Sequence, residues 1–389
     1  MTPPARLATV AKIIMGQSPP GDSYNRTGEG LPLLNGPTEF GATSPECTLF
    51  TTDSRRECEA SDLIFCVRGS TTGRMNWADR KYSLGRGVCS IRGASPPETR
   101  FIRYCVEDQL HALLQLAGGG TFPNLSKVDI EQFQIPWPEN RIRIAGILSA
   151  YDDLIENNQR RIKILEEMAR SLYLEWFVHF RFPGHEKVKM VPSAIGIIPQ
   201  GWEVKQLGEL ATVTMGLSPK GDTYNEEENG MPLVNGPVEF GDRFTKRMKW
   251  TTEPTKFCKE GDLVVCVRGS TTGKYVKSDG VYCLGRGVCG ISSQHQCFIE
   301  LLFEHELPTL LSQTSGSTFP SWTGPQLKSH PVVAPPAEIL GRFDALVKPM
   351  SVAVLAYSRQ IQNLRRTRDL LLPRLLSGQI ELKSMEAVA

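Results

Sequence analysis

The sequence feature that most constrains the fold is an internal duplication. MGQSPPGDSYNRTGEGLPLLNGPTEFG at residues 15–41 returns as MGLSPKGDTYNEEENGMPLVNGPVEFG at residues 215–241. CVRGSTTG at residues 66–73 recurs without change at residues 266–273, and LGRGVC recurs at the same spacing of 200 residues. A constant offset across several motifs predicts two copies of one domain within a single chain.

Each copy has the pattern of a compact α+β domain. Short apolar runs of strand character, such as Leu63 to Val67 and Leu263 to Val267, alternate with segments rich in Gly, Pro and Asn. Asp62 and Asp262 each precede such a run and suit a turn that begins the strand.

A long amphipathic helix is predicted after each copy. Apolar residues recur three and four apart over residues 140–177 and again over residues 337–377, with charged residues on the opposite face. The predicted seam comprises Ile144, Ile147, Leu148, Tyr151, Leu154, Ile155, Ile162, Leu165, Met168, Ala169, Leu172 and Trp176 in the first helix, and Phe343, Leu346, Val347, Met350, Val354, Tyr357, Ile361, Leu364, Leu371 and Leu375 in the second. Such narrow seams favour an antiparallel coiled coil between the two helices, which would act as a spacer between the two domains.

Several residues interrupt this helical pattern. Asn158 falls on the seam, where it is either a buried amide that fixes the register or a solvated edge residue. Pro349 and Pro373 are expected to kink or divide the second helix, and Gly378 is expected to end it.

The predicted domain boundaries follow from these patterns. They are a first domain at residues 1–139, a first spacer helix at 140–182, a linker at 183–200, a second domain at 201–336, a second spacer helix at 337–380 and a tail at 381–389.

Composition is that of an ordinary soluble protein, with 40% hydrophobic and 22% charged residues among 389. Neither a membrane-spanning run nor a signal peptide is visible, so we expect a cytoplasmic protein with no membrane partner. The ten cysteines include no C-x-x-C pair and are expected to be buried, reduced thiols. The six histidines show no metal-ligand spacing.

No motif predicts catalysis by this chain. GSTTGK at Gly269 has three residues between its glycines, whereas a phosphate-binding Walker loop needs four, and Tyr275 stands where that loop needs Ser or Thr. No G-x-G-x-x-G opens a helix, and the Asn/Asp-Pro-Pro-aromatic signature of an amino-methyltransferase is missing. We therefore expect a non-catalytic protein with no cofactor of its own.

The distribution of charge predicts a nucleic-acid partner. Residues 66–104 contain eight basic residues against two acidic ones, and residues 243–290 contain ten against four. Both basic stretches include Gly-rich loops, in which backbone N–H groups and hydroxyls can reach phosphates. The candidate DNA-binding residues are Arg68, Ser70, Thr71, Thr72, Arg74, Arg80, Lys81 and Arg86 in the first copy, and Arg268, Ser270, Thr271, Thr272, Lys274, Lys277 and Arg286 in the second.

Three interpretations of RGSTTG remain open: a structural turn with a solvated arginine, a contact to phosphates, and a reader of bases. Identity between the copies favours the framework and phosphate roles. Base-reading residues are expected where the copies diverge, at residues 74–81 against 274–279 or 43–55 against 243–255.

Taken together, the motifs resemble the specificity subunit of type I restriction-modification enzymes. The resemblance rests on MGxSPxGDxYN, LPLLNGP, GDLVVCVRGSTTGK, LGRGV, IPQGWEVKQLGEL and LLLPRLLSGQIEL, and it spans nearly the whole chain in order. It implies two target-recognition domains, each binding one half of a split double-stranded DNA site. It also implies two methyltransferase subunits that bring S-adenosylmethionine, and restriction subunits that bring ATP and magnesium.

Two features depart from the family pattern: the prolines of the second helix and the strong similarity of the two domains. If both domains read DNA with similar residues, the target should be an interrupted near-palindrome. The alternatives are the specificity chain of a type II-like fused system and a coiled-coil scaffold whose two domains bind ligands other than DNA. A steep salt dependence of DNA binding would distinguish a specificity chain, of either a type I or a type II-like system, from the scaffold.

Overall fold

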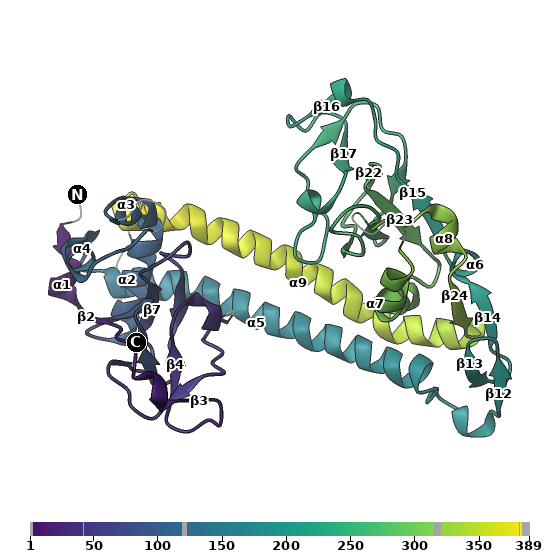
Figure 1. The fold of residues 1–389 in the computed structure, drawn as a ribbon. Helices are drawn as coiled ribbons and strands as arrows, with labels where there is room; N and C mark the ends of the chain where they lie inside the picture. Colours follow the sequence, from purple (N-terminus) through teal and green to yellow (C-terminus); the bar gives the residue numbers. More distant parts are fainter. Residues whose placement is uncertain (1–2, 42, 119–122, 315–319, 381, 383–389) are drawn as a thin grey trace, which may run out of the picture. The chain divides into compact units, whose positions relative to one another are not determined.

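A computed structural model describes residues 3–41, 43–118, 123–314, 320–380 and 382 (Figure 1). The chain forms two compact units, one of residues 1–157 with 360–389 and the other of residues 158–359. Each unit combines one copy of the duplicated α+β domain with parts of two long helices. The predicted α+β class with two similar domains is confirmed.

The first domain is built around a four-stranded antiparallel sheet of order β2-β10-β7-β8. These strands are Ala11–Met15, Val88–Gly93, Leu63–Cys66 and Met75–Trp77, respectively. All four residues of β7 are buried, because helix α2 (Pro96–Asp108) and the shared hydrophobic core cover the sheet. The register pairs Val88 of β10 with Cys66 of β7, so the turns beside these residues lie at the same end of the sheet.

A second, mixed sheet projects from the first, with the order β3-β5-β4-β9-β6. Its strands are Tyr24–Asn25, Phe50–Thr51, Leu31–Leu34, Tyr82–Leu84 and Glu57–Cys58. Strand β4 runs parallel to β9, and the other pairs are antiparallel. The remaining elements of this domain are β1 (Pro4–Arg6) paired with β11 (Gln134–Pro136), and the short helices α1 (Leu7–Val10), α3 (Leu110–Gln115) and α4 (Lys127–Gln132).

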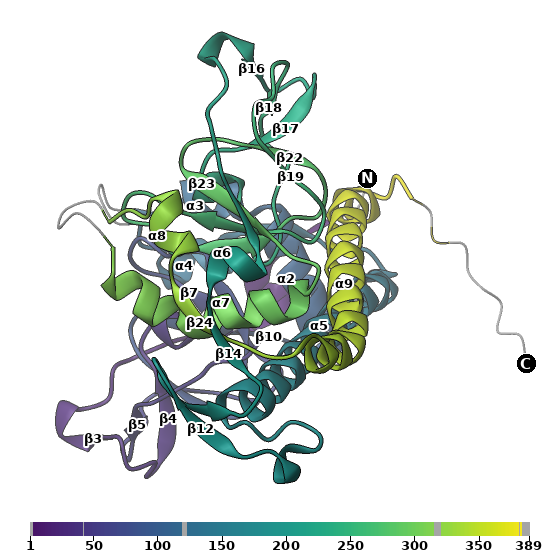
Figure 2. The same ribbon diagram turned by 90° about the vertical axis from the view of Figure 1, so that its right-hand side faces the viewer.

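The second domain repeats this topology. Its central sheet has the order β15-β23-β20-β21 (Thr212–Met215, Val288–Ser292, Leu263–Cys266, Tyr275–Lys277), and its projecting sheet has the order β16-β18-β17-β22-β19 (Tyr224–Asn225, Trp250–Thr251, Met231–Val234, Tyr282–Leu284, Phe257–Cys258). The other elements are β14 (Glu203–Gln206) paired with β24 (Pro331–Ala334), and helices α6 (Leu207–Leu210), α7 (Gln296–Ser312) and α8 (Gly324–Lys328). Figure 2 shows strands β16 to β18 extending away from α7.

Two long helices, α5 (Arg141–Tyr173) and α9 (Ala337–Ser377), run antiparallel where they pack within each unit. In the first unit, Arg368 of α9 pairs with Asp152 of α5 at 2.5 Å. In the second unit, the rings of Trp176 and Phe343 lie 5.8 Å apart. Within the second unit, Arg161 of α5 also lies over the ring of Tyr357 of α9, at 5.5 Å, so residue numbers in the two helices change in opposite directions from contact to contact, as the sequence predicts.

Of the 22 residues of the predicted seam, 11 are buried and eight are half-buried. Leu154, Met168 and Leu346 are exposed, so the seam is narrower than the sequence pattern predicts. Asn158 is only 6% exposed, which contradicts its interpretation as a solvated edge residue.

The prediction that proline would divide the second helix is wrong. Helix α9 continues through both Pro349 and Pro373. Both residues are exposed, so the carbonyl groups that lose an amide partner can be hydrated. Gly378 has a φ of +78° and follows the last helical residue, which confirms its predicted role as the stop signal.

The segment predicted as a linker contains a hairpin, β12 (Met190–Ser193) with β13 (Gly196–Pro199). Aromatic packing anchors its base, since the rings of Phe182 and Trp202 lie 5.1 Å apart and both residues are buried. The sequence of this segment has no amphipathic period, so the hairpin was not predicted. Apart from residue 382, the predicted tail lies outside the described residues.

The cysteines behave as the sequence predicts. All ten are free thiols, and eight of them are buried. Burial raises the pKa of the Cys58 thiol to about 12 and that of Cys266 to about 11. These thiols are therefore protonated and pack as small apolar side chains.

Candidate nucleic-acid interface

Three repeated motifs meet at one end of the central sheet in each domain. In the first domain, the amide of Gly16 donates to the carbonyl of Val88 at 3.0 Å, which joins the MGQSP turn to the start of β10. The amide of Val67 donates to the carbonyl of Gly87 at 2.9 Å, which joins the RGSTTG turn to the LGRG turn. The equivalent bonds in the second domain have the same lengths.

Glycine is required where these turns touch. A β-carbon on Gly16 would collide with the carbonyl oxygen of Gly85, and one on Gly87 would collide with the carbonyl oxygen of Asn35. The NGP turn that contains Asn35 therefore belongs to the same cluster. The second domain shows the same close approaches at Gly216 and Gly287, so four sequence motifs form one compact platform in each domain.

The RGSTTG turn is rigid and internally bonded. Gly69 and Gly73 have φ values of +89° and +95°, which favour glycine. The hydroxyl of Thr72 donates to the carbonyl oxygens of Gly69 at 2.8 Å and Pro123 at 3.0 Å. Thr272 does the same in the second domain. These two threonines thus hold the turn together, and their hydroxyl protons are used internally.

The platform presents basic side chains to solvent. Arg68, Ser70, Arg74 and Arg86 are exposed in the first domain. Their equivalents Arg268, Ser270, Lys274 and Arg286 are also exposed, and Thr71 and Thr271 are half-buried. No ion pair holds any of these six basic side chains within the described part of the chain. The structure thus brings together most of the predicted binding residues of each copy.

Three predicted residues lie elsewhere. Lys81 pairs with Glu57 at 2.5 Å, and the guanidinium of Arg80 lies 5.5 Å from the ring centroid of Tyr82; both follow β8, away from the platform. Lys277 forms an ion pair with Glu300 and donates to the hydroxyl of Ser351 at 2.6 Å.

All three side chains thus contact other residues of the chain. The ammonium group of Lys277 has partners on both α7 and α9, and its role in DNA binding stays a prediction. The equivalent residue of the first domain is Trp77, over which Arg103 places its guanidinium at 5.2 Å. The two copies therefore use different chemistry at this position.

A groove of about 580 Å³ lies beside the platform of the second domain. Thr272, Lys274 and Gly241 contribute to its wall, together with Phe240 and Leu311. The groove therefore combines a cationic side chain with apolar surface.

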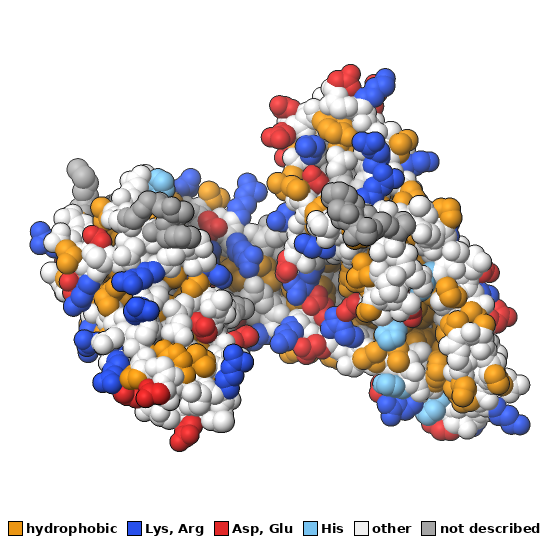
Figure 3. All heavy atoms as spheres, in the orientation of Figure 1, with side chains coloured by type: hydrophobic (Ala, Val, Ile, Leu, Met, Phe, Trp, Pro, Cys, Tyr) orange, Lys and Arg blue, Asp and Glu red, His pale blue; other side chains and the backbone are white. Residues whose placement is uncertain are grey.

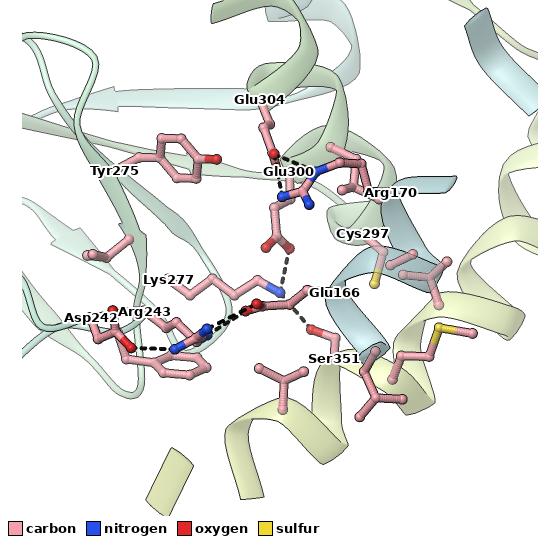
Figure 4. Close-up of a pocket in the computed structure, with 18 residues that line it drawn as sticks. Glu166, Arg170, Asp242, Arg243, Tyr275, Lys277, Cys297, Glu300, Glu304 and Ser351 are labelled. Carbon is pink, nitrogen blue, oxygen red and sulfur yellow. Dashed lines mark hydrogen bonds and ion pairs between the residues drawn. The ribbon is translucent and has the colours of Figure 1, made fainter. Parts of the chain in front are cut away.

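A second pocket of about 320 Å³ lies where the second domain meets α5 and α9 within its own unit (Figure 4). Arg243 makes two bonds to the Glu166 carboxylate, at 2.5 and 3.1 Å. Arg170 pairs with Glu304 at 2.6 Å. Burial raises the pKa of Glu300 even though Lys277 beside it acts in the opposite direction. The charged side chains that line this pocket pair with one another, and these ion pairs, together with the bond from Lys277 to Ser351 of α9, hold the second domain against α5 and α9.

Sequence reasoning missed this fastening. The sequence pattern puts Glu166 and Arg170 on the charged face of the first helix, opposite the apolar seam, and Arg243 within the basic stretch of residues 243–290. The ion pairs Arg243–Glu166 and Arg170–Glu304 could not be predicted from the sequence, because their partners lie 77 and 134 residues apart.

Side chains of both signs cover the second unit. Figure 3 shows Lys and Arg side chains around the part that carries β16 and β17, with acidic side chains toward its tip. No group of residues suited to hold a metal ion occurs among the described residues. None of the described helices has the length and apolarity needed to cross a membrane.

Comparison with protein families assigns the fold. The model of the type I restriction modification DNA specificity domain matches residues 6–167 and 199–348, one match for each copy of the duplication. The chain belongs to this family. The resemblance drawn from the motifs is thereby confirmed.

Curated relatives of the type I specificity family support this assignment. The MjaIX specificity subunit of Methanocaldococcus jannaschii is 28% identical over 288 residues, which cover 70% of this chain and 66% of the relative. The putative MjaX specificity subunit of the same organism is 26% identical, covering 67% and 62%. The chain thus spans slightly less than two thirds of the length of these relatives. A crystal structure of a type I S subunit from M. genitalium shares the fold, with a TM-score of 0.67, 17% identity and 96% of each chain covered.

Proposed function

We propose that this protein is the DNA-recognition subunit of a type I restriction-modification complex, and that it reads a site in two parts. The observation that carries this proposal is the pair of equivalent platforms, each presenting three exposed basic side chains beside Gly-rich turns. Such a surface suits a phosphate backbone, because each neutralised phosphate releases counterions.

The division of labour within each platform follows from its hydrogen bonds. Thr72 and Thr272 stabilise the turn, whereas Arg68, Arg86 and their equivalents are exposed and can donate to phosphates or to guanine edges. Because the platforms are equivalent, the two half-sites should be related as inverted repeats. The target would then be an interrupted near-palindrome.

In this function the chain is not an enzyme. Two methyltransferase subunits would supply S-adenosylmethionine, and restriction subunits would supply ATP and magnesium.

The proposal is tested by expressing the chain with its methyltransferase partner and sequencing the methylated DNA of the host. We expect one methylated motif composed of two short halves and a fixed gap. Methylation without a defined motif, or identical methylation when the chain is omitted, would refute the proposal. Binding that is insensitive to salt would favour the scaffold alternative.

A further inference from the structure

The two domains share a backbone but differ in charge at one exposed position beside the platform. In both, the segment that leads into the projecting sheet makes the same bond: the amide of residue 46 donates to the Glu39 carbonyl at 2.7 Å, and the amide of residue 246 donates to the Glu239 carbonyl at 2.7 Å. The side chain at this position is Glu46 in the first domain and Lys246 in the second. Both are exposed.

The place of this side chain is also the same. Lys246 lies along Gly241, with Cγ and Cε 3.4 and 3.3 Å from the point that a β-carbon on Gly241 would occupy. Glu46 lies along Gly41, with Cγ and Oε1 at 3.1 and 3.0 Å. Because the two side chains pack in the same way along their glycines, the ammonium group of Lys246 and the carboxylate of Glu46 lie at matching positions of the two domains.

That position borders the groove of the second domain. Gly241, against which Lys246 packs, contributes to the groove wall together with Lys274. The first domain has the matching components: Gly73 approaches Leu110 and Leu114 as Gly273 approaches Leu307 and Leu311, and Arg74 replaces Lys274. Glu46 is therefore an acidic side chain at the position that Lys246 occupies beside the groove of the second domain.

The neighbouring arginine does not share this role. The Nη2 atom of Arg247 lies 3.5 Å from the β-carbon position of Gly280, beyond β21. Arg80 occupies the corresponding region of the first domain, over Tyr82. Arg247 thus substitutes for Arg80, whereas the side chain at position 46 or 246 has the opposite charge in the two domains.

We propose that Glu46 and Lys246 are specificity-determining residues that read the equivalent base pair of the two half-sites with opposite hydrogen-bond demands. This proposal rests on the proposed function and deepens it. A carboxylate is repelled by phosphate, but it accepts a hydrogen bond from the amino group of cytosine; an ammonium group donates to O6 and N7 of guanine. The near-palindrome is therefore broken at this base pair.

The test measures binding of the full-length chain to DNA duplexes in which each base pair of the second half-site is varied in turn. We expect Lys246→Glu to lose about 10- to 100-fold in affinity for the original base at one position, and to prefer there a base that offers an amino group. The reciprocal change Glu46→Lys should move the preference at the matching position of the first half-site toward guanine. Lys259→Glu is the control, because it makes the same charge change on an exposed residue near the start of β20.

Distinct outcomes separate this inference from the proposed function. If the unmodified chain shows no sequence preference, the proposed function fails. If it shows one, and both charge inversions leave every base preference unchanged, only the assignment of residues 46 and 246 is refuted. An equal loss for all sequences would also refute it, because it would indicate a phosphate contact. Lys246→Gln guards against misfolding, since it should weaken discrimination at the same position without reversing it.

Discussion

Arg92 holds the buried carboxylate of Asp62 with two nitrogens, Nε at 2.5 Å from Oδ1 and Nη2 at 2.8 Å from Oδ2. The hydroxyl of Ser90 donates to the same carboxylate at 2.6 Å. The second domain has Asp262 at the equivalent position but Gly290 and Ser292 in place of these two partners. Asp262 forms no ion pair among the described residues, although the amide of Lys259 donates to it at 2.9 Å.

This difference predicts unequal effects of matched mutations on stability. Arg92→Ser should lower the free energy of unfolding of the first unit by about 2 kcal/mol, because it leaves a buried carboxylate without its counter-ion at a site that solvent partly reaches. Ser292→Arg should stabilise the second unit. Thermal melting of both variants checks this, and an unchanged melting curve for Arg92→Ser would contradict it.

The platform arginines should contribute affinity more than sequence preference. Arg286→Ala should weaken binding to all DNA sequences by about tenfold and should reduce the slope of log affinity against log salt by about 0.9, the value for one phosphate contact. Salt titration of DNA binding measures both quantities. Lys205→Ala on β14 serves as the control and should leave the slope unchanged. A lost preference for a single base would instead show that Arg286 reads bases.

The bond between Arg243 and Glu166 should fasten the second domain to α5. Arg243→Glu should destabilise the second unit by about 1 kcal/mol, because the pair is only partly shielded from solvent. Adding Glu166→Arg should recover part of that loss by restoring opposite charges. A double-mutant cycle in thermal melting provides the measurement, and additive losses would refute the coupling.

Glu300 predicts a pH dependence of the second unit. Burial raises its pKa above the ordinary value of 4.5, so the folded state retains its proton more strongly than the unfolded state. Its contribution to stability is fully present below pH 4.5 and is lost as the pH rises through the raised pKa. Glu300→Gln should therefore show a smaller fall in melting temperature than the unmodified protein over that interval. Parallel pH dependences would contradict this assignment.

The paired helices should set the distance between the half-sites. Deleting residues 156–162 of α5 together with 355–361 of α9 removes one heptad from each and about 10 Å of length. The gap in the methylated motif should shrink by about three base pairs at 3.4 Å per pair. The half-sites themselves should not change. An unchanged gap would mean that the helices do not measure it.

Sequence alone predicted the elements that depend on local pattern or repetition. The offset of 200 residues identified the two domains, and the apolar period identified both helices. The shared motifs also marked the turns that form the platform, but their meeting at one end of the sheet depends on close backbone contacts, such as those of Gly16 and Gly87, which the sequence does not show.

The remaining features depend on contacts between distant residues. The hairpin β12–β13 lacks a strong alternating pattern, and its anchor is aromatic packing around Trp202. The ion pair between Lys277 and Glu300 could not be predicted, because a lysine on a strand gives no sign of its partner on a distant helix. Continuity of α9 through Pro349 depends on which face of the helix that residue occupies. The hairpin, the ion pair and the continuous helix all depend on burial in the tertiary structure. The spacing of apolar residues along the sequence does not encode that burial.

The composition of the first unit has a consequence for biosynthesis. Its hydrophobic core contains Leu372, Leu375 and Leu376 from the end of α9, together with residues that begin at Leu7. The second unit is continuous from residue 158 to residue 359. During synthesis, the first unit therefore cannot complete its hydrophobic core until the end of α9 has been made. The second unit, although it emerges later, has all of its residues before that point.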